Sequence, residues 1–327
     1  MEQLVNVCSN YSLPISDWVL YIHKNTALNY KQTPKNSLTS FEGQRNLAID
    51  IPLFRKLIGK NNKTSIDIQK IYPYAPKNPA SITLPRIFYN RIPKCGSATI
   101  LKLIQNMAKT NNFTYIHSAQ YHEHSLERKR RKTLVYDLCD THAPWLYDRH
   151  LFFINFTHYG CDMPDYINLF REPLDRRRSR YYYHDFDKKY NMTFAECLQK
   201  NKKKNVYKCL TGGPATFYFC GSMEVCRSAN KESLSIAKNR IDRFYKVVGV
   251  TEDMISFLRL LEHHYPTMFS GVIDIYKKMT YVNVDHKKHE IISDKTKRKM
   301  RKILKFEYEL YDFILQRFNK QKEEFGI

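Results

Sequence analysis

One segment limits the fold more than any other, because it places a strand, a tight loop and a helix in direct succession. Residues 86–92 (RIFYNRI) are rich in β-forming side chains, and residues 98–109 (ATILKLIQNMAK) are apolar at helical spacing. Small residues join the two. A strand that passes through a short loop into a helix is the repeating unit of α/β proteins.

The same pattern recurs along the chain and predicts the fold class. Further strands are expected at residues 113–117, 151–156, 166–170 and 246–250, with helices between them and long helices at 252–264 and 294–322. We therefore predict an α/β fold, a doubly wound parallel sheet flanked by helices. Residues 1–80 lack periodicity and are interpreted as an irregular lead-in, followed by one folded domain over residues 81–327.

Charge indicates the kind of partner. The 327 residues include 54 Lys and Arg against 32 Asp and Glu, a net charge of +22. Such a positive field favours polyanions over neutral partners. Nucleic acid, an anionic membrane and a sulfated polysaccharide all meet this condition, so charge alone does not choose among them.

The cysteines favour an oxidising compartment. Four of the eight lie close together in the sequence, and none of the eight forms a CxxC pair, which argues against a zinc finger and gives no indication of a metal site. The spacing predicts two short disulfide loops, with free buried thiols as the alternative: Cys197 with Cys209, and Cys220 with Cys226.

Sequence signals for secretion disagree with one another. Five Asn-x-Ser/Thr sequons fit a secretory route but arise easily by chance: Asn10, Asn62, Asn112, Asn155 and Asn191. No apolar run is long enough for a membrane-spanning helix, and no signal peptide is visible at the N-terminus. We interpret this as an anchor that is missing or diverged.

The loop between the first strand and helix has the composition of an anion site. A helix N-terminus offers unpaired N–H groups and a positive dipole end to an oxyanion. A mobile ammonium and hydroxyl donors would add to these. The order Lys-x-Gly-Ser differs from a Walker A loop, and an ordinary tight turn is the alternative. The residues concerned are Pro93, Lys94, Cys95, Gly96, Ser97, Ala98 and Thr99.

A second anion-binding element is predicted in residues 165–186 (DYINLFREPLDRRRSRYYYHDF). An apolar strand ends at Arg171, and Pro173 suits the first turn of a helix. Ser179 lies two turns into that helix, so Arg171 and Ser179 can converge on one oxyanion. A surface salt bridge is the alternative role for this arginine.

Together these segments resemble the uronyl 2-O-sulfotransferase and heparan sulfate 2-O-sulfotransferase family. The resemblance covers residues 85–325 and is carried by FYNRIPKCGSATI, DRHLFFINFTHYG, DYINLFREPLDR, TFAEC, FYFCG, VVGVTEDM and FEYELYDF. It implies a P-loop-like sulfotransferase fold and transfer of a sulfuryl group from 3′-phosphoadenosine-5′-phosphosulfate (PAPS), with PAP as product and no metal. YNR-x-x-KCGS resembles the uronyl branch more closely.

The resemblance also implies roles for single residues. Lys94 would stabilise the leaving phosphate, and residues 94–99 would bind the 5′-phosphosulfate. Arg171 and Ser179 would hold the 3′-phosphate. His150 matches the family's catalytic base. The acceptor, a sulfated glycosaminoglycan, would contact residues that match acceptor-facing positions: Arg91, Pro93, His117 and Arg180.

Alternatives remain open at this stage. Two alternatives concern the acceptor, which is heparan sulfate in one alternative and dermatan or chondroitin sulfate in the other. They arise because Arg180 stands where the heparan branch carries an aromatic residue. A non-catalytic binder of glycosaminoglycan or nucleic acid is a further alternative, but no nucleic-acid module is visible and no nucleic acid is expected. Family resemblance implies the Golgi lumen or membrane and permits a homo-oligomer. Basic runs at 128–132, 176–178 and 202–204 are interpreted as a solvated face, or as extensions of the acceptor groove.

Overall fold

A parallel β-sheet forms the centre of the described chain. The computed structural model describes residues 84–200, 203–279 and 291–327. Within them the sheet has five strands in the order β2-β3-β1-β4-β5. The strands are β1 (Arg86–Asn90), β2 (Thr114–His117), β3 (Trp145–Arg149), β4 (Asp165–Phe170) and β5 (Tyr245–Val250).

Strand β1 occupies the middle of the sheet. Tyr89 pairs with Asp148 of β3 on one side and with Ile167 of β4 on the other, and each pair of strands is parallel. Strands β2 and β5 also pair in parallel with their neighbours. All five carboxyl ends therefore lie along one edge of the sheet, and the α/β parallel prediction is confirmed.

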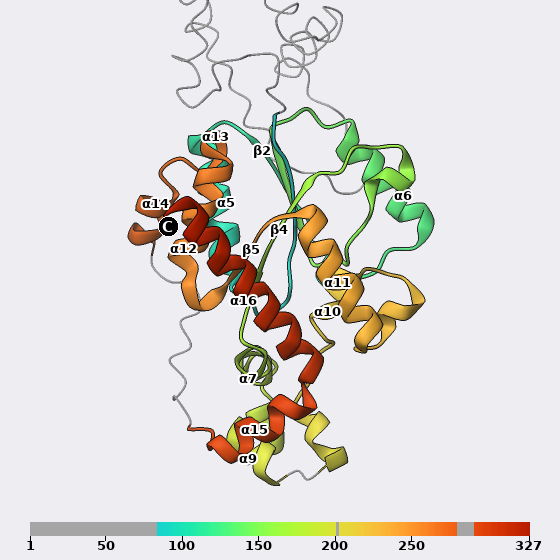
Figure 1. Cartoon of the computed structure of the whole chain (residues 1–327), viewed down its shortest axis with the longest axis vertical. Coiled ribbons are helices and arrows are strands. Elements are labelled where there is room, and N and C mark those ends of the chain that lie inside the picture. The colour runs from blue at the N-terminus through green and yellow to red at the C-terminus, as the bar shows by residue number, and fades with distance from the viewer. Residues whose placement is uncertain (1–83, 201–202, 280–290) are drawn as a thin grey trace, which may run out of the picture. The chain divides into compact units, whose positions relative to one another are not determined.

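Helices cover both faces of this sheet (Figure 1). Figure 1 shows one group of helices on the left of the sheet. In this group α12 contacts strand β5, and both α12 and α5 contact α13 and α14. This group comprises α5 (Ser97–Thr110), α12 (Met254–His264), α13 (Pro266–Phe269) and α14 (Val272–Lys278). The group on the right comprises α6 (Arg128–Cys139), α10 (Thr216–Cys220) and α11 (Lys231–Phe244).

The long helix α16 (Lys305–Phe325) protects the edge strand β5. Arg317 donates to the Tyr245 carbonyl at 2.7 Å, and Gln321 donates to the Lys246 carbonyl at 2.9 Å. An uncovered strand edge invites pairing with another chain. These side-chain donors, with the helix above them, satisfy part of that edge.

A second, smaller core lies below the sheet in Figure 1. Leu174 and Tyr181 of α7 (Pro173–Tyr183) pack there against Phe194, Met300 and Tyr308. The other elements around this core and in the connecting segments are α8 (Phe186–Tyr190), α9 (Phe194–Lys200), α15 (Asp294–Ile303), η2 (Phe156–Tyr159), η3 (Lys203–Lys208), η4 (Glu224–Arg227) and η5 (Thr251–Asp253).

The prediction of a strand at residues 151–156 is wrong, because the strand in this part of the chain is β3, which begins six residues earlier. Leu151, Phe153 and Ile154 are buried, but they belong to a loop whose backbone bonds go elsewhere. Phe153 N–H donates to the Tyr218 carbonyl at 2.9 Å. A continuous apolar run indicates burial and does not by itself distinguish a strand from a buried loop. The true strand carries the charged residues Asp148 and Arg149, so its sequence lacks the apolar pattern expected of a buried strand.

The single helix predicted at residues 294–322 is two helices, α15 and α16, which meet at Leu304. Leu304 closes α15 by donating its N–H to the Met300 carbonyl at 2.8 Å. Met300 packs in the small core, whereas Ile314 and Phe318 of α16 pack in the large one. The change of direction lets one amphipathic stretch reach both cores.

Three disulfides staple the described chain. Cys197–Cys209 and Cys220–Cys226 confirm the two predicted loops. Cys139–Cys161, which joins the end of α6 to the residue after Gly160, was not predicted. Cys95 is a free, buried thiol, and Cys8 and the predicted lead-in of residues 1–80 lie outside the described residues. No helix in the described ranges is long and apolar enough to cross a membrane.

The basic run at residues 176–178 belongs mostly to the interior. Arg176 and Arg177 are each 3% exposed and both pair with the buried carboxylate of Glu307 on α16. Burial alone would raise the pKa of Glu307, but the two guanidinium groups outweigh it and hold that pKa below its usual range. Both the solvated-face and the groove interpretation are therefore wrong for these two arginines. They fasten α7 to α16.

We expect Glu307→Ala to lower the free energy of unfolding by about 3–5 kcal/mol, because it leaves two guanidinium groups buried without a carboxylate. Urea denaturation under oxidising conditions measures this change. The matched control is Glu309→Ala on the same helix, whose carboxylate pairs with Lys305 at the surface. That control should cost no more than about 1 kcal/mol. Equal losses in the two variants would contradict the assignment.

Candidate active site

The predicted functional residues gather where the parallel strands end. His117 is the last residue of β2, His150 follows β3, Arg91 follows β1 and Arg171 follows β4. In open α/β sheets, ligands bind in the crevice outside the carboxyl ends of the strands, near the point where the strand order reverses. Here that point lies beside β1, whose neighbours are β3 and β4.

The loop after β1 has the backbone geometry of an anion cradle. Lys94 and Gly96 adopt positive φ angles of 67° and 71°. A left-handed conformation is rare for lysine, and such local turns direct successive N–H groups into one concave site. No side chain caps helix α5, so the N–H groups of Ser97, Ala98 and Thr99 in its first turn remain available.

Gly96 also lets the loop approach the sheet closely. A Cβ atom at this position would lie 3.3 Å from Leu169 Cδ2 of β4 and 3.4 Å from Thr251 Cγ2, just after β5. Both these tight contacts and the positive φ favour glycine at this position. The cradle is therefore fixed against the ends of β4 and β5.

Cys95 anchors the loop rather than offering a reactive group. Its side chain is fully buried, and burial raises the pKa of the thiol to about 12. The thiol lies 3.8 Å from the Pro93 carbonyl. A protonated, buried thiol is no nucleophile at neutral pH, so at this position only the backbone can contribute to anion binding.

Helix α7 begins next to that loop. Pro173 takes its first position, and Glu172 caps it by accepting from the Asp175 N–H at 2.7 Å. The Lys94 ammonium lies 3.7 Å from the centroid of the Tyr183 ring. Tyr183 stands one turn beyond Ser179 on the same helix face. The lysine-bearing loop is thus in contact with the helix that carries Ser179.

His150 is held as a neutral imidazole with one nitrogen left for proton transfer. Its Nδ1 atom lies 2.9 Å from the Arg91 carbonyl oxygen, and because a carbonyl only accepts, Nδ1 donates. The other nitrogen, Nε2, then carries the lone pair. Burial, followed by the positive charge of Arg91, lowers the pKa of His150 to about 3.

A buried carboxylate that the sequence did not single out organises this side of the site. Asp148 pairs with Arg91 (Oδ2 to Nε, 2.7 Å) and with His117 (Oδ1 to Nδ1, 2.9 Å), and it accepts from the Tyr115 hydroxyl at 2.5 Å. His117 Nε2 in turn lies 3.2 Å from the Tyr121 hydroxyl. The available signal was the acid of the DRH triplet, since an Asp at a strand end beside Arg and His indicates a polar network.

The predicted acceptor-contacting residues differ in accessibility. The side chain of His117 is 31% exposed, whereas that of Arg91 is 1% exposed and committed to Asp148. Arg180 is half-buried and lies against Gly212, with a Cδ atom 2.6 Å from where a Cβ would stand. His117 and Arg180 can therefore meet a ligand directly, and Arg91 acts mainly on its neighbours.

We expect His150 to stay neutral, with its proton on Nδ1, from pH 8 down to about pH 4. Its folded pKa of about 3 lies below the ordinary value, so protonation opposes folding and stability falls as the pH drops below 6.5. Two-dimensional ¹⁵N imidazole spectra across this pH range test the tautomer and the charge. In urea the same ring should titrate near 6.5. A folded-state titration near 6.5 would contradict the assignment.

Comparisons with known proteins place these features in context. No protein-family model matches the chain. The human uronyl 2-sulfotransferase is 28% identical over 272 residues, which cover 76% of this chain and 67% of that protein. A solved sulfotransferase from Alicyclobacillus acidocaldarius aligns with a TM-score of 0.38 and 12% identity over 71% of this chain and 96% of its own, too distant a likeness to bear on the site.

Two invertebrate proteins are more similar in sequence. The heparan sulfate 2-O-sulfotransferase hst-2 of Caenorhabditis elegans is 31% identical over 255 residues, covering 71% of this chain and 78% of that protein. The heparin sulfate O-sulfotransferase of Drosophila melanogaster is 30% identical over 262 residues, covering 73% of each. The chain, with its strand-end cradle and buried histidine, belongs to the family of uronyl and heparan sulfate 2-O-sulfotransferases.

Proposed function

We propose that this protein transfers a sulfuryl group from PAPS to the 2-hydroxyl of a uronic acid in a glycosaminoglycan. The observation that carries the proposal is the arrangement at one edge of the sheet: the Lys94–Gly96 cradle follows β1 and contacts Tyr183 of α7, and His150 follows β3 and bonds to the Arg91 carbonyl. The names of its relatives support the reaction class. The net charge of +22 suits a polyanionic acceptor.

The residues at the cradle fit the two ends of PAPS. Backbone N–H groups from the first turn of α5, with the hydroxyls of Ser97 and Thr99, would bind the 5′-phosphosulfate. Arg171 and Ser179 would hold the 3′-phosphate by charge-assisted hydrogen bonds. Because Lys94 lies over Tyr183, on the helix that carries Ser179, both ends of one nucleotide can be held at once.

His150 would act as the general base. Its Nε2 atom takes the proton of the acceptor hydroxyl while the new oxygen–sulfur bond forms and the bond from sulfur to the 5′-phosphate oxygen breaks. Lys94 stabilises the negative charge left on that phosphate. The low pKa of His150 reflects burial among cations, and the negative charges of PAPS and of the acceptor would raise it towards the working pH.

On the acceptor side, His117 and Arg180 would contact sulfate or carboxylate groups, and Pro93 would line the entrance. Asp148 fixes His117, and Arg91 carries the carbonyl that fixes His150. An arginine at position 180 supports dermatan or chondroitin sulfate as the acceptor over heparan sulfate. Transfer from labelled PAPS to desulfated heparan, dermatan and chondroitin chains, followed by disaccharide analysis, decides between them.

Family membership supports a place in the Golgi lumen or membrane.

We expect His150→Ala to fold and to bind PAP with unchanged affinity, but to lose transfer by about 10²–10⁴-fold, the range typical of a general base. Calorimetric titration with PAP and single-turnover transfer from labelled PAPS measure the two properties. His122→Ala, at an exposed histidine, serves as the control and should keep wild-type turnover. Retained turnover in His150→Ala would remove His150 from this role.

We expect Arg171→Ala to lose most of the preference for PAP over AMP, since only PAP carries a 3′-phosphate. The loss of a charge-assisted bond predicts about 10- to 100-fold weaker binding of PAP, with AMP binding nearly unchanged. Lys94→Ala, in contrast, should weaken both nucleotides alike. An Arg171→Ala variant that weakened AMP as strongly as PAP would place Arg171 elsewhere.

A further inference from the structure

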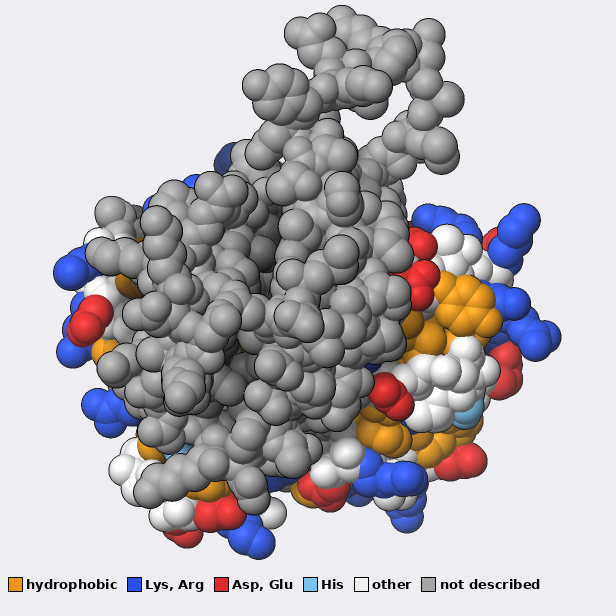
Figure 2. All heavy atoms as spheres, turned by 90° about the horizontal axis from the view of Figure 1, so that it is seen from above, with side chains coloured by type: hydrophobic (Ala, Val, Ile, Leu, Met, Phe, Trp, Pro, Cys, Tyr) orange, Lys and Arg blue, Asp and Glu red, His pale blue; other side chains and the backbone are white. Residues whose placement is uncertain are grey.

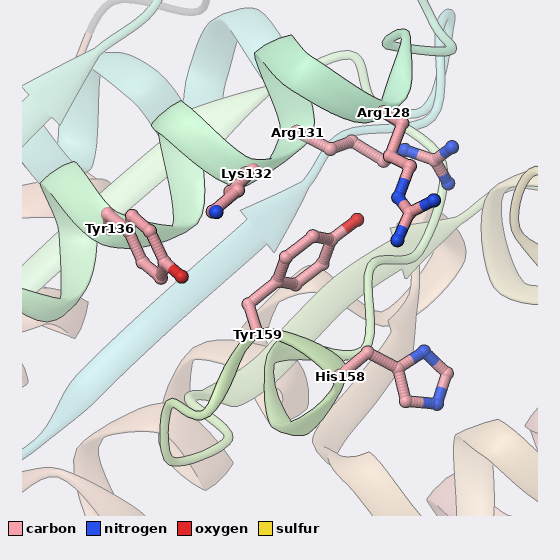
Figure 3. Close-up of a pocket in the computed structure, with 6 residues that line it drawn as sticks. All are labelled: Arg128, Arg131, Lys132, Tyr136, His158 and Tyr159. Atoms are coloured by element: carbon pink, nitrogen blue, oxygen red, sulfur yellow. The ribbon is translucent and has the colours of Figure 1, made fainter.

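A pocket away from the strand-end site lies between helix α6 and the short helix η2. It has a volume of about 440 Å³, within the range of ordinary ligand sites. None of its lining residues belongs to the cradle, to α7 or to the His150 network: Arg128, Arg131, Lys132, Tyr136, His158 and Tyr159. Figure 3 shows Tyr159 rising from η2 towards α6, with Lys132 on one side and the side chains of Arg128 and Arg131 on the other.

The pocket wall concentrates positive charge that the described residues do not neutralise. Arg128, Arg131 and Lys132 pair with no carboxylate in the described chain, whereas their neighbour Arg130 pairs with Glu123. The buried Nε atom of Arg131 also has no hydrogen-bond partner there. Like charges at i, i+3 and i, i+4 destabilise a helix slightly, so an anion in the pocket would relieve this repulsion.

The two walls are fixed before any ligand arrives. The Cys139–Cys161 disulfide joins the last residue of α6 to the segment just after η2. Asn155 caps η2 by accepting from the Thr157 N–H at 3.0 Å, and Phe156 is buried beneath it. A preformed site loses less conformational entropy on binding. Among the disulfides of the described residues, this cross-link is the one that the spacing of the cysteines did not predict.

The pocket is also joined to the proposed active site. Glu123 links Arg130 of α6 to Arg149 at the end of β3, next to His150. His158 lies eight positions after His150 in the chain, so their Cα atoms are no more than about 29 Å apart. Figure 2 shows Lys and Arg side chains along the right rim of the described surface, on the side where Figure 1 places α6, with others on the left rim and acidic side chains among them. One extended polysaccharide can span both.

We propose that this α6–η2 pocket binds a sulfated sugar of the acceptor glycosaminoglycan, at a distance from the sugar that reacts; the inference rests on the proposed function. The cations bind sulfate and carboxylate groups, and the rings of Tyr136 and Tyr159 offer apolar faces with polar edges to a sugar. A concave pocket suits a single sugar ring, whereas a duplex nucleic acid needs a stripe of cations along an open face. The pocket sets the length and sulfation of the acceptor that the enzyme prefers.

Charge reversal at Lys132 tests this with a matched control on the same helix. Lys132→Glu should raise the KM for a long acceptor chain about fivefold or more, with kcat unchanged, because it weakens binding remote from the reacting sugar. A tetrasaccharide too short to reach the pocket should react normally. Lys129→Glu changes the same charge at an exposed position outside the pocket and should leave both acceptors within about twofold. Equal effects of the two substitutions would overturn the proposal.

Acetylation footprinting gives a readout that needs no turnover. An endoglycosidase first removes any glycan from Asn155. Bound long-chain glycosaminoglycan should then protect Lys132 but not Lys129 from acetylation. The same result is expected in the wild type and in His150→Ala. Equal protection of both lysines, or equal protection of Lys132 by duplex DNA of the same charge, would overturn the proposal. Protection of Lys132 by glycosaminoglycan in a protein that transfers no sulfuryl group would support the pocket and refute the proposed function instead.

Discussion

Asp148 is a fully buried carboxylate at the end of β3, and a buried charge is costly unless cations and donors surround it. Arg91, His117 and Tyr115 supply those partners from β2 and from the residue that follows β1, the two strands that flank β3. Because Arg91 is held by Asp148, its carbonyl is in place to bind Nδ1 of His150. The tautomer of the proposed base therefore depends on a carboxylate that never touches it, and through it on the register between β1 and β3.

The other half of the site depends on close approach rather than on charge pairing. Gly96 sets the loop against Leu169 and Thr251, so the first turn of α5 opens at the ends of β4 and β5. The buried pair Arg176 and Arg177 fastens α7 to α16 through Glu307. The helix that carries Ser179 is thus held by α16 through Glu307, and the lysine loop contacts the same helix at Tyr183. Both interactions would keep the proposed nucleotide site in place before a nucleotide binds.

Charge is divided between two regions with different tasks. Near the strand ends, cations lie close to buried carboxylates, which limits their number and fixes their positions. On α6 three cations face a pocket without a described carboxylate. In the proposed function, a polyanion would be bound over a broad basic surface while the reacting hydroxyl meets a single oriented imidazole. This division agrees with a net charge of +22 that no one site accounts for.

Local chemistry in the sequence determined the parallel α/β fold, the glycine-bearing cradle after β1, the proline start of α7 and two disulfides, since each depends on residues close together in the chain. Tertiary packing decided the rest. Residues 151–156 are as apolar as a strand, but the N–H of Phe153 bonds to the Tyr218 carbonyl of helix α10 and not to a neighbouring strand. Arg176 and Arg177 have the sequence pattern of surface charges, but in the fold both pair with the buried Glu307. The role of Asp148 and the Cys139–Cys161 bridge depend on partners that only folding brings near, and no local pattern records such partners.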